Sequence, residues 1–114
     1  MSETPRNGPT KRTTIEVVNR VSSMCWNFRK PETRDDFETL VSMWQEALSG
    51  NYYQQHVYLD AVTSWLKTAD VKSAPPYPGD ILRHCRLVVE EMERDPSRRD
   101  DLYSWRDQVR ALKS

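Results

Sequence analysis

The side chains of this chain that are best suited to chemistry are two histidines and two cysteines. His84 and Cys85 are neighbours, but successive residues on a helix point about 100° apart and do not face each other. This geometry favours a partly exposed histidine beside a buried thiol over a catalytic pair. A zinc site built from Cys25, His56, His84 and Cys85 would need four scattered ligands, without the CxxC or HxxxH spacing of known sites. We therefore expect no metal centre.

The sequence also lacks the patterns that bind nucleotides or supply acids and bases. Its three glycines form neither a GxGxxG nor a Walker pattern. The carboxylate pairs Asp35–Asp36 and Asp100–Asp101 fall near predicted helix starts, where they complement the helix dipole without catalysis. We expect no catalytic residues and no cofactor, and the chain is predicted not to be an enzyme. The chain is therefore expected to act by contact with another molecule rather than by catalysis.

Composition indicates a single small domain. The 114 residues are 37% hydrophobic and 30% charged, with a net charge of zero, so a broad affinity for nucleic acid is not favoured. No apolar run approaches the roughly 20 residues of a membrane span, and the first residues lack the apolar core of a secretory signal. We expect a soluble, cytoplasmic protein with no membrane partner, in which Cys25 and Cys85 remain buried thiols.

Apolar residues recur at helical spacing along most of the chain. The clearest stripe contains Phe37, Leu40, Val41, Trp44 and Leu48, at i, i+3, i+4, i+7 and i+11. Similar stripes predict helices that begin near residues 13, 33, 51, 78 and 97, the first ending near residue 29. The fold class is therefore all-α, a compact bundle of four to five helices. Residues 1–12 are predicted to be a disordered tail, 13–96 the bundle, and 97–114 a mobile C-terminal amphipathic basic helix.

The predicted helix boundaries carry specific local signals. Thr33 and Asn51 are suitable N-caps for the second and third helices. The junction Ala74-Pro-Pro-Tyr-Pro-Gly-Asp-Ile81 ends the third helix, because two consecutive prolines cannot continue it. Pro78 then suits the first position of the next helix, and Asp80 lies in its first turn, where a carboxylate is favourable.

Basic residues are concentrated in the last helix. It carries Arg98, Arg99, Arg106, Arg110 and Lys113. They could contact phosphates or an acidic protein surface, but three aspartates are interleaved with them and favour a solvated face held by ion pairs. A small helical nucleic-acid-binding or transcription-regulatory module stays open as an alternative.

The order of several short segments resembles a known family. These are Leu40-Val-Ser-Met-Trp-Gln-Glu-Ala-Leu48, then Tyr52-Tyr53, then Ala61-Val-Thr-Ser-Trp-Leu66, then Pro75-Pro-Tyr-Pro-Gly-Asp-Ile81. This order is similar to that of the phage replicative-helicase loader and inhibitor family, over roughly residues 15–93. The matching residues are Trp44, Tyr53, Ala61, Val62, Pro75, Pro76, Asp80 and Ile81. The chain departs from the family at Ser73-Ala74, where members often have an apolar residue before the two prolines.

The resemblance implies a phage DNA-replication accessory protein in the host bacterial cytoplasm. Such a protein binds a hexameric replicative helicase, which it loads or inhibits without catalytic activity of its own, and its association with DNA is at most indirect. The C-terminal part of the family is flexible and important for the helicase contact. By position, this gives Arg98, Arg99, Arg106, Arg110 and Lys113 a partner-binding role. A host-directed phage inhibitor of another enzyme would share these features and stays open.

Overall fold

The computed structural model describes residues 3–25, 28–68 and 74–113. These residues form five α-helices, α1 (Lys11–Met24), α2 (Arg34–Ala47), α3 (Gln55–Thr68), α4 (Pro78–Arg94) and α5 (Pro96–Lys113). Since the described residues contain no strand, the predicted all-α class is confirmed. None of these helices is both long and apolar enough to cross a membrane.

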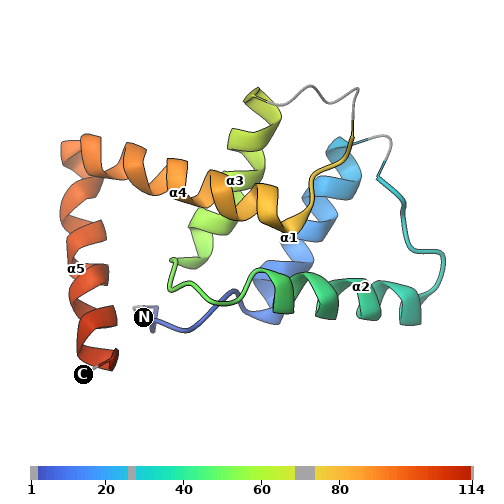
Figure 1. Ribbon diagram of the computed structural model, residues 1–114, viewed down its shortest axis with the longest axis horizontal. Helices are drawn as coiled ribbons and strands as arrows, with labels where there is room; N and C mark the ends of the chain where they lie inside the picture. The colour runs from blue at the N-terminus through green and yellow to red at the C-terminus, as the bar shows by residue number, and fades with distance from the viewer. Residues whose placement is uncertain (1–2, 26–27, 69–73, 114) are drawn as a thin grey trace.

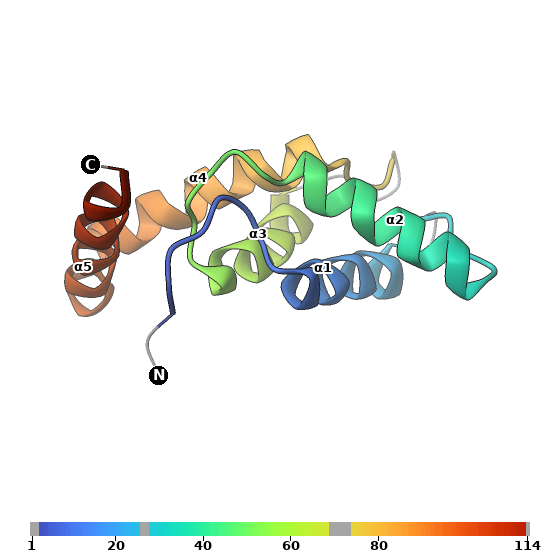
Figure 2. The same cartoon turned by 90° about the horizontal axis from the view of Figure 1, so that it is seen from below.

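The helices form two layers, and the last helix closes one end (Figures 1 and 2). α1 and α3 pack against each other and form one layer. α2 and α4 form the other layer, in which α2 packs on α1 and α4 packs on α3. α5 contacts α4 and runs nearly crosswise to it (Figure 1). The sharp turn falls at Pro96, which cannot continue α4 but suits the first position of α5. α5 thus extends the molecule at one end and leaves a corner against α4.

The core lies between the two layers and is built from the predicted stripes. Of the α2 stripe, Val41, Trp44 and Leu48 are buried, and Phe37 and Leu40 are half-buried against them. Each aliphatic side chain fully buried in this way contributes about 1.5–3 kcal/mol relative to an exposed one. The stripes of α1, α3 and α4 meet these residues at Val17, Val18, Val21, Val57, Tyr58, Ala61, Val62, Trp65, Ile81, Cys85, Val88 and Met92.

The first helix is shorter than predicted. It ends at Met24 rather than near Arg29, because the backbone of Cys25 is extended and the Phe28 N–H donates to the Cys25 carbonyl at 3.1 Å. The Phe28 ring lies edge-on to Trp44, with the ring centroids 6.3 Å apart. Residues 26 and 27, which the prediction also placed in this helix, lie outside the described residues.

Two of the predicted helix starts are confirmed. Thr33 Oγ1 accepts a hydrogen bond from the Asp36 N–H at 3.1 Å, so Thr33 caps α2. At the start of α4, Pro78 takes the first position and the Asp80 carboxylate accepts from the Tyr77 N–H at 2.9 Å. The proline-rich junction therefore sets the direction of α4 through backbone geometry and one carboxylate.

The predicted cap of the third helix is wrong. α3 begins at Gln55, whose backbone N–H donates to Glu3 Oε1 at 2.7 Å. A residue near the N-terminus therefore satisfies the first N–H of this helix. Asn51 instead offers its carbonyl to the Gly8 N–H at 2.8 Å. A side chain 52 positions away cannot be identified as a cap from local sequence.

Residues 3–10 form an N-terminal strap that packs on the bundle. Of the predicted tail, residues 1–12, the first two lie outside the described residues, residues 3–10 form this strap, and α1 already begins at Lys11. Pro5 and Pro9 are buried, and the Pro9 carbonyl accepts from Gln45 Nε2 at 3.2 Å. The polar composition predicted disorder because it offers few apolar anchors, yet two prolines and several hydrogen bonds hold the strap.

Replacing Gly8 by alanine should destabilise the protein, because its φ of +106° is unfavourable for other residues and an added Cβ would lie 2.9 Å from Ser49 Cα. We expect a loss of about 1–3 kcal/mol in the free energy of unfolding, measured by urea denaturation with circular dichroism. Gly79→Ala is the matched control, since it lies in α4 with open space around it and should gain roughly 0.5–1 kcal/mol. Equal stability of Gly8→Ala and the wild type would show that the strap is not held as described.

Candidate functional site

The first two of the five basic residues predicted to bind a partner, Arg98 and Arg99, make contacts within the bundle. Arg98 Nη2 lies 3.7 Å from Asp60 Oδ2 on α3, and Arg99 Nε donates to the Glu93 carbonyl on α4 at 3.0 Å. Both side chains therefore fasten the beginning of α5 to the bundle. Both guanidinium groups are therefore already engaged in contacts within the chain.

The next two basic residues, Arg106 and Arg110, form ion pairs at the surface. Arg106 pairs with Glu93 of α4, and both side chains are 41% exposed. Arg110 pairs with Asp107 one turn earlier on α5, with Nη2 and Oδ1 2.9 Å apart. The predicted solvated face held by ion pairs is found here. Such exposed pairs contribute little to stability, and they leave both guanidinium groups at the surface.

The fifth basic residue, Lys113, has no carboxylate partner among the described residues. Its Nζ lies 4.8 Å from the centroid of the Tyr52 ring, within the range of a cation–π interaction. This contact joins the end of α5 to the loop between α2 and α3. The five basic residues thus have different partners: Arg98 contacts α3, Arg99 and Arg106 both contact Glu93 of α4, Arg110 pairs within α5, and Lys113 contacts Tyr52.

Where α5 turns away from α4, the structure contains a cavity of about 130 Å³. We call it the corner cavity, and its apolar walls are Tyr52, Tyr53, Val57, Val89, Leu102 and Trp105, with Gln54 and Arg106 completing the lining. Trp105 Nε1 donates to the Tyr52 carbonyl at 2.7 Å, so the indole that forms one wall of the cavity is held in place. This combination of apolar walls and few polar groups is typical of a binding site.

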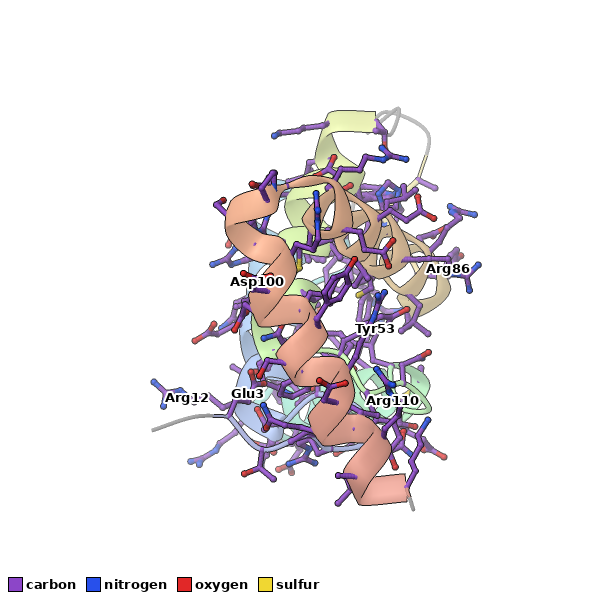
Figure 3. The ribbon with its side chains drawn as sticks, turned by 90° about the vertical axis from the view of Figure 1, so that its left-hand side faces the viewer. Glu3, Arg12, Tyr53, Arg86, Asp100 and Arg110 are labelled. Carbon is purple, nitrogen blue, oxygen red and sulfur yellow. The ribbon has the colours of Figure 1, made fainter. Side chains whose placement is uncertain are left out.

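Another cation lies beside the corner cavity. Arg86 of α4 interacts with the Tyr53 hydroxyl: burial raises the pKa of Tyr53, and the Arg86 guanidinium opposes this increase. No described carboxylate pairs with Arg86. Figure 3 shows Arg86, Tyr53 and Arg110 on one side of α5, whereas Glu3, Arg12 and Asp100 lie on the other.

Sequence reasoning singled out the α5 cations but missed Arg86 and Val89. Neither residue departs from an ordinary amphipathic pattern on α4, so no local signal marks them. They join the site only because α5 folds back beside the α2–α3 loop, and the sequence does not predict that angle. Tyr52 and Tyr53, which the sequence marked only through the family resemblance, are half-buried.

A second cluster with possible chemistry joins α3 to α4. The sequence predicted His84 to be partly exposed, which is wrong, because only 6% of it is accessible. Ser64 Oγ lies 2.9 Å from His84 Nδ1, and Thr68 Oγ1 lies 3.5 Å from His84 Nε2. No described carboxylate orients the imidazole, as the third member of a hydrolytic triad would. The contact between Ser64 and His84 therefore links α3 to α4. The sequence signal for it was the spacing of Ser64 and Thr68, which places a hydroxyl on each of two successive turns of α3.

The side chains that a zinc site would have needed, Cys25, His56, His84 and Cys85, have other surroundings in the structure. His56 is held by Asp60 and Gln54, with Nδ1 and Nε2 each 3.3 Å from an oxygen. Cys25 and Cys85 are buried free thiols, and burial raises the pKa of Cys85 to about 12. Within residues 3–25, 28–68 and 74–113, no group of three or more His, Cys, Asp and Glu side chains is arranged to hold a metal ion.

Comparisons of the chain with protein-family models, with curated proteins and with solved structures give no match.

The buried His84 should make folding stability depend on pH. Burial lowers its pKa from 6.5, with a smaller contribution from Arg83 that Asp80 opposes. As the pH falls through 6.5, the unfolded chain therefore takes up the proton first, and the free energy of unfolding decreases. We expect urea denaturation between pH 7.5 and 5.5 to show a steeper loss for the wild type than for His84→Gln. Identical slopes would contradict a neutral, buried imidazole.

Proposed function

We propose that this chain is a phage DNA-replication accessory protein that binds a hexameric replicative helicase in the host bacterial cytoplasm and loads or inhibits it. The observation that carries this proposal is the role of the residues shared with the loader and inhibitor family. Trp44, Ala61, Val62 and Ile81 are all buried in one core. Residues of this kind, at matching spacing, support a common bundle in the chain and in the family it resembles.

The residues at the proline-rich junction have equally definite roles. Pro76 is buried, and Asp80 satisfies the first turn of α4 while also pairing with Arg83 at 2.8 Å. They fix the direction of α4 and, through it, the position of α5. The resemblance therefore concerns the scaffold, and the partner-binding surface has to be sought on exposed residues.

The end of α5 is the surface we propose for the helicase contact. Arg110 is 76% exposed, and Lys113 contacts the ring of Tyr52 rather than a carboxylate of the described residues. α5 itself is docked on the bundle, because Leu102 and Trp105 are only 3% and 5% exposed. A docked helix presents its charges in a fixed geometry, so little conformational entropy is lost when a partner binds. Contact with the helicase would then act by restricting or positioning its subunits.

The double variant Arg110→Glu/Lys113→Glu should weaken helicase binding at least about tenfold, because it reverses two exposed charges without removing core contacts. Biolayer interferometry with the phage or host replicative helicase, with and without nucleotide, measures the dissociation constant. Arg12→Glu, on the opposite side of α5, is the control and should bind as the wild type does.

A shortened chain ending at Asp107 provides a second test. It removes Arg110 and Lys113 but keeps Leu102 and Trp105, whereas cutting before residue 97 would expose the core. We expect it to fold, as judged by circular dichroism, and to lose helicase binding. If the full-length protein binds no helicase under any nucleotide condition, the proposed function is wrong. Steeply salt-dependent DNA binding in gel shifts would favour the nucleic-acid module instead.

A further inference from the structure

The corner cavity has the size and lining of a receptor for one side chain. Its volume of about 130 Å³ corresponds to roughly four water molecules, at about 30 Å³ each. Aromatic and aliphatic groups supply most of its walls, so a bulky apolar group would gain more there than water does. An anchor side chain in a desolvated pocket is the usual centre of a protein–protein interface.

The apolar surface continues beyond the cavity along α5. Leu102 and Trp105 are buried, but the next two members of the same stripe are not: Val109 is half-buried and Leu112 is 54% exposed. A stripe that is covered at one end and open at the other offers a partner segment an apolar track that leads from the cavity. The track has the length of about two helical turns, since α-helices rise about 1.5 Å per residue.

The surroundings of the cavity favour negative charge. Three cations lie at its edge: Arg106 lines it, Arg86 interacts with Tyr53 and Lys113 lies over the ring of Tyr52. Two carboxylates also lie there, and both are engaged, Glu93 with Arg106 and Asp101 with the Gln54 side-chain amide. Arg86 and Lys113 contact tyrosine rings or hydroxyls rather than carboxylates. Charge complementarity therefore indicates acidic residues beside the anchor side chain.

We propose that the corner cavity receives one bulky apolar side chain from an acidic segment of a partner protein, with its carboxylates against Arg86 and Lys113. This inference rests on the proposed function, since the segment would belong to the helicase. A protein segment fits better than single-stranded nucleic acid. Stacked bases need open aromatic faces, whereas Trp105 is buried and Lys113 already covers the Tyr52 ring.

Fluorescence anisotropy with synthetic peptides tests this inference without the helicase. The probe is a labelled twelve-residue peptide with a central Phe and three Asp or Glu on either side. Matched peptides replace Phe by Ala, or every acid by its amide. We expect the acidic Phe peptide to bind at least about tenfold more tightly than either control. Equal affinity for all three peptides, or tighter binding of oligo(dT) of twelve nucleotides, overturns the inference.

Two variants locate the binding on the protein. Val89→Phe fills the cavity from a partly exposed wall, and Arg86→Glu/Lys113→Glu reverses the charges beside it. Each should weaken binding of the acidic Phe peptide about tenfold, whereas Arg12→Glu should leave it unchanged. Circular dichroism checks folding, and the charge variant keeps the test decisive if Val89→Phe is unstable. Peptide binding that survives both variants overturns the inference.

The same variants, measured against the helicase, separate this inference from the proposed function. If the helicase binds the wild type and both cavity variants equally, the proposed function stands and the cavity is not its contact. If the acidic Phe peptide binds at the cavity but the helicase does not, the cavity stands and the helicase assignment is wrong.

Discussion

The backbone of the short loop between α2 and α3 must find hydrogen-bond partners, and both ends of the chain supply them. From the N-terminal strap, Asn7 Oδ1 accepts from the Gly50 N–H at 2.7 Å, and Gly8 donates to the Asn51 carbonyl. From α5, Trp105 donates to the Tyr52 carbonyl. A loop whose polar groups were buried without these bonds would lose about 1–3 kcal/mol for each. The loop is therefore the point at which distant segments become one fold.

This constraint also creates the candidate site. Because Trp105 is tied to Tyr52, α5 cannot pack flat on α4 along its whole length, and the corner between them stays partly open. Tyr52 and Tyr53 then wall a cavity that no single helix could form. The cations of α4 and α5 gather beside it because both helices turn charged faces to water at the same corner. Packing and a candidate recognition surface thus have a common physical origin.

The helices were predictable because their signals are local. Apolar stripes at a spacing of 3.6 residues placed the core residues of α2 and α4 correctly, and Thr33, Pro78 and Asp80 marked two starts. Errors arose where distant contacts override local preference. Glu3 rather than Asn51 satisfies the start of α3, and hydroxyls of α3 bury His84, which its neighbours on α4 would leave half-exposed. The order of the strap could not be predicted because its anchors lie 36 to 52 positions away, on α2, in the α2–α3 loop and at the start of α3.

The sequence by itself determined the all-α class, the registers of the helices and the concentration of basic residues in the last one, because periodicity and composition act within a few residues. Only the tertiary structure decided that α5 crosses α4, that Arg98 contacts α3 and Arg99 contacts α4, and that Val89 joins Trp105 at one cavity with Arg86 beside it. These outcomes depend on the angle between packed helices and on hydrogen bonds that join residues about 50 positions apart. Such terms follow from how all the side chains fill space together, and no short stretch of sequence contains them.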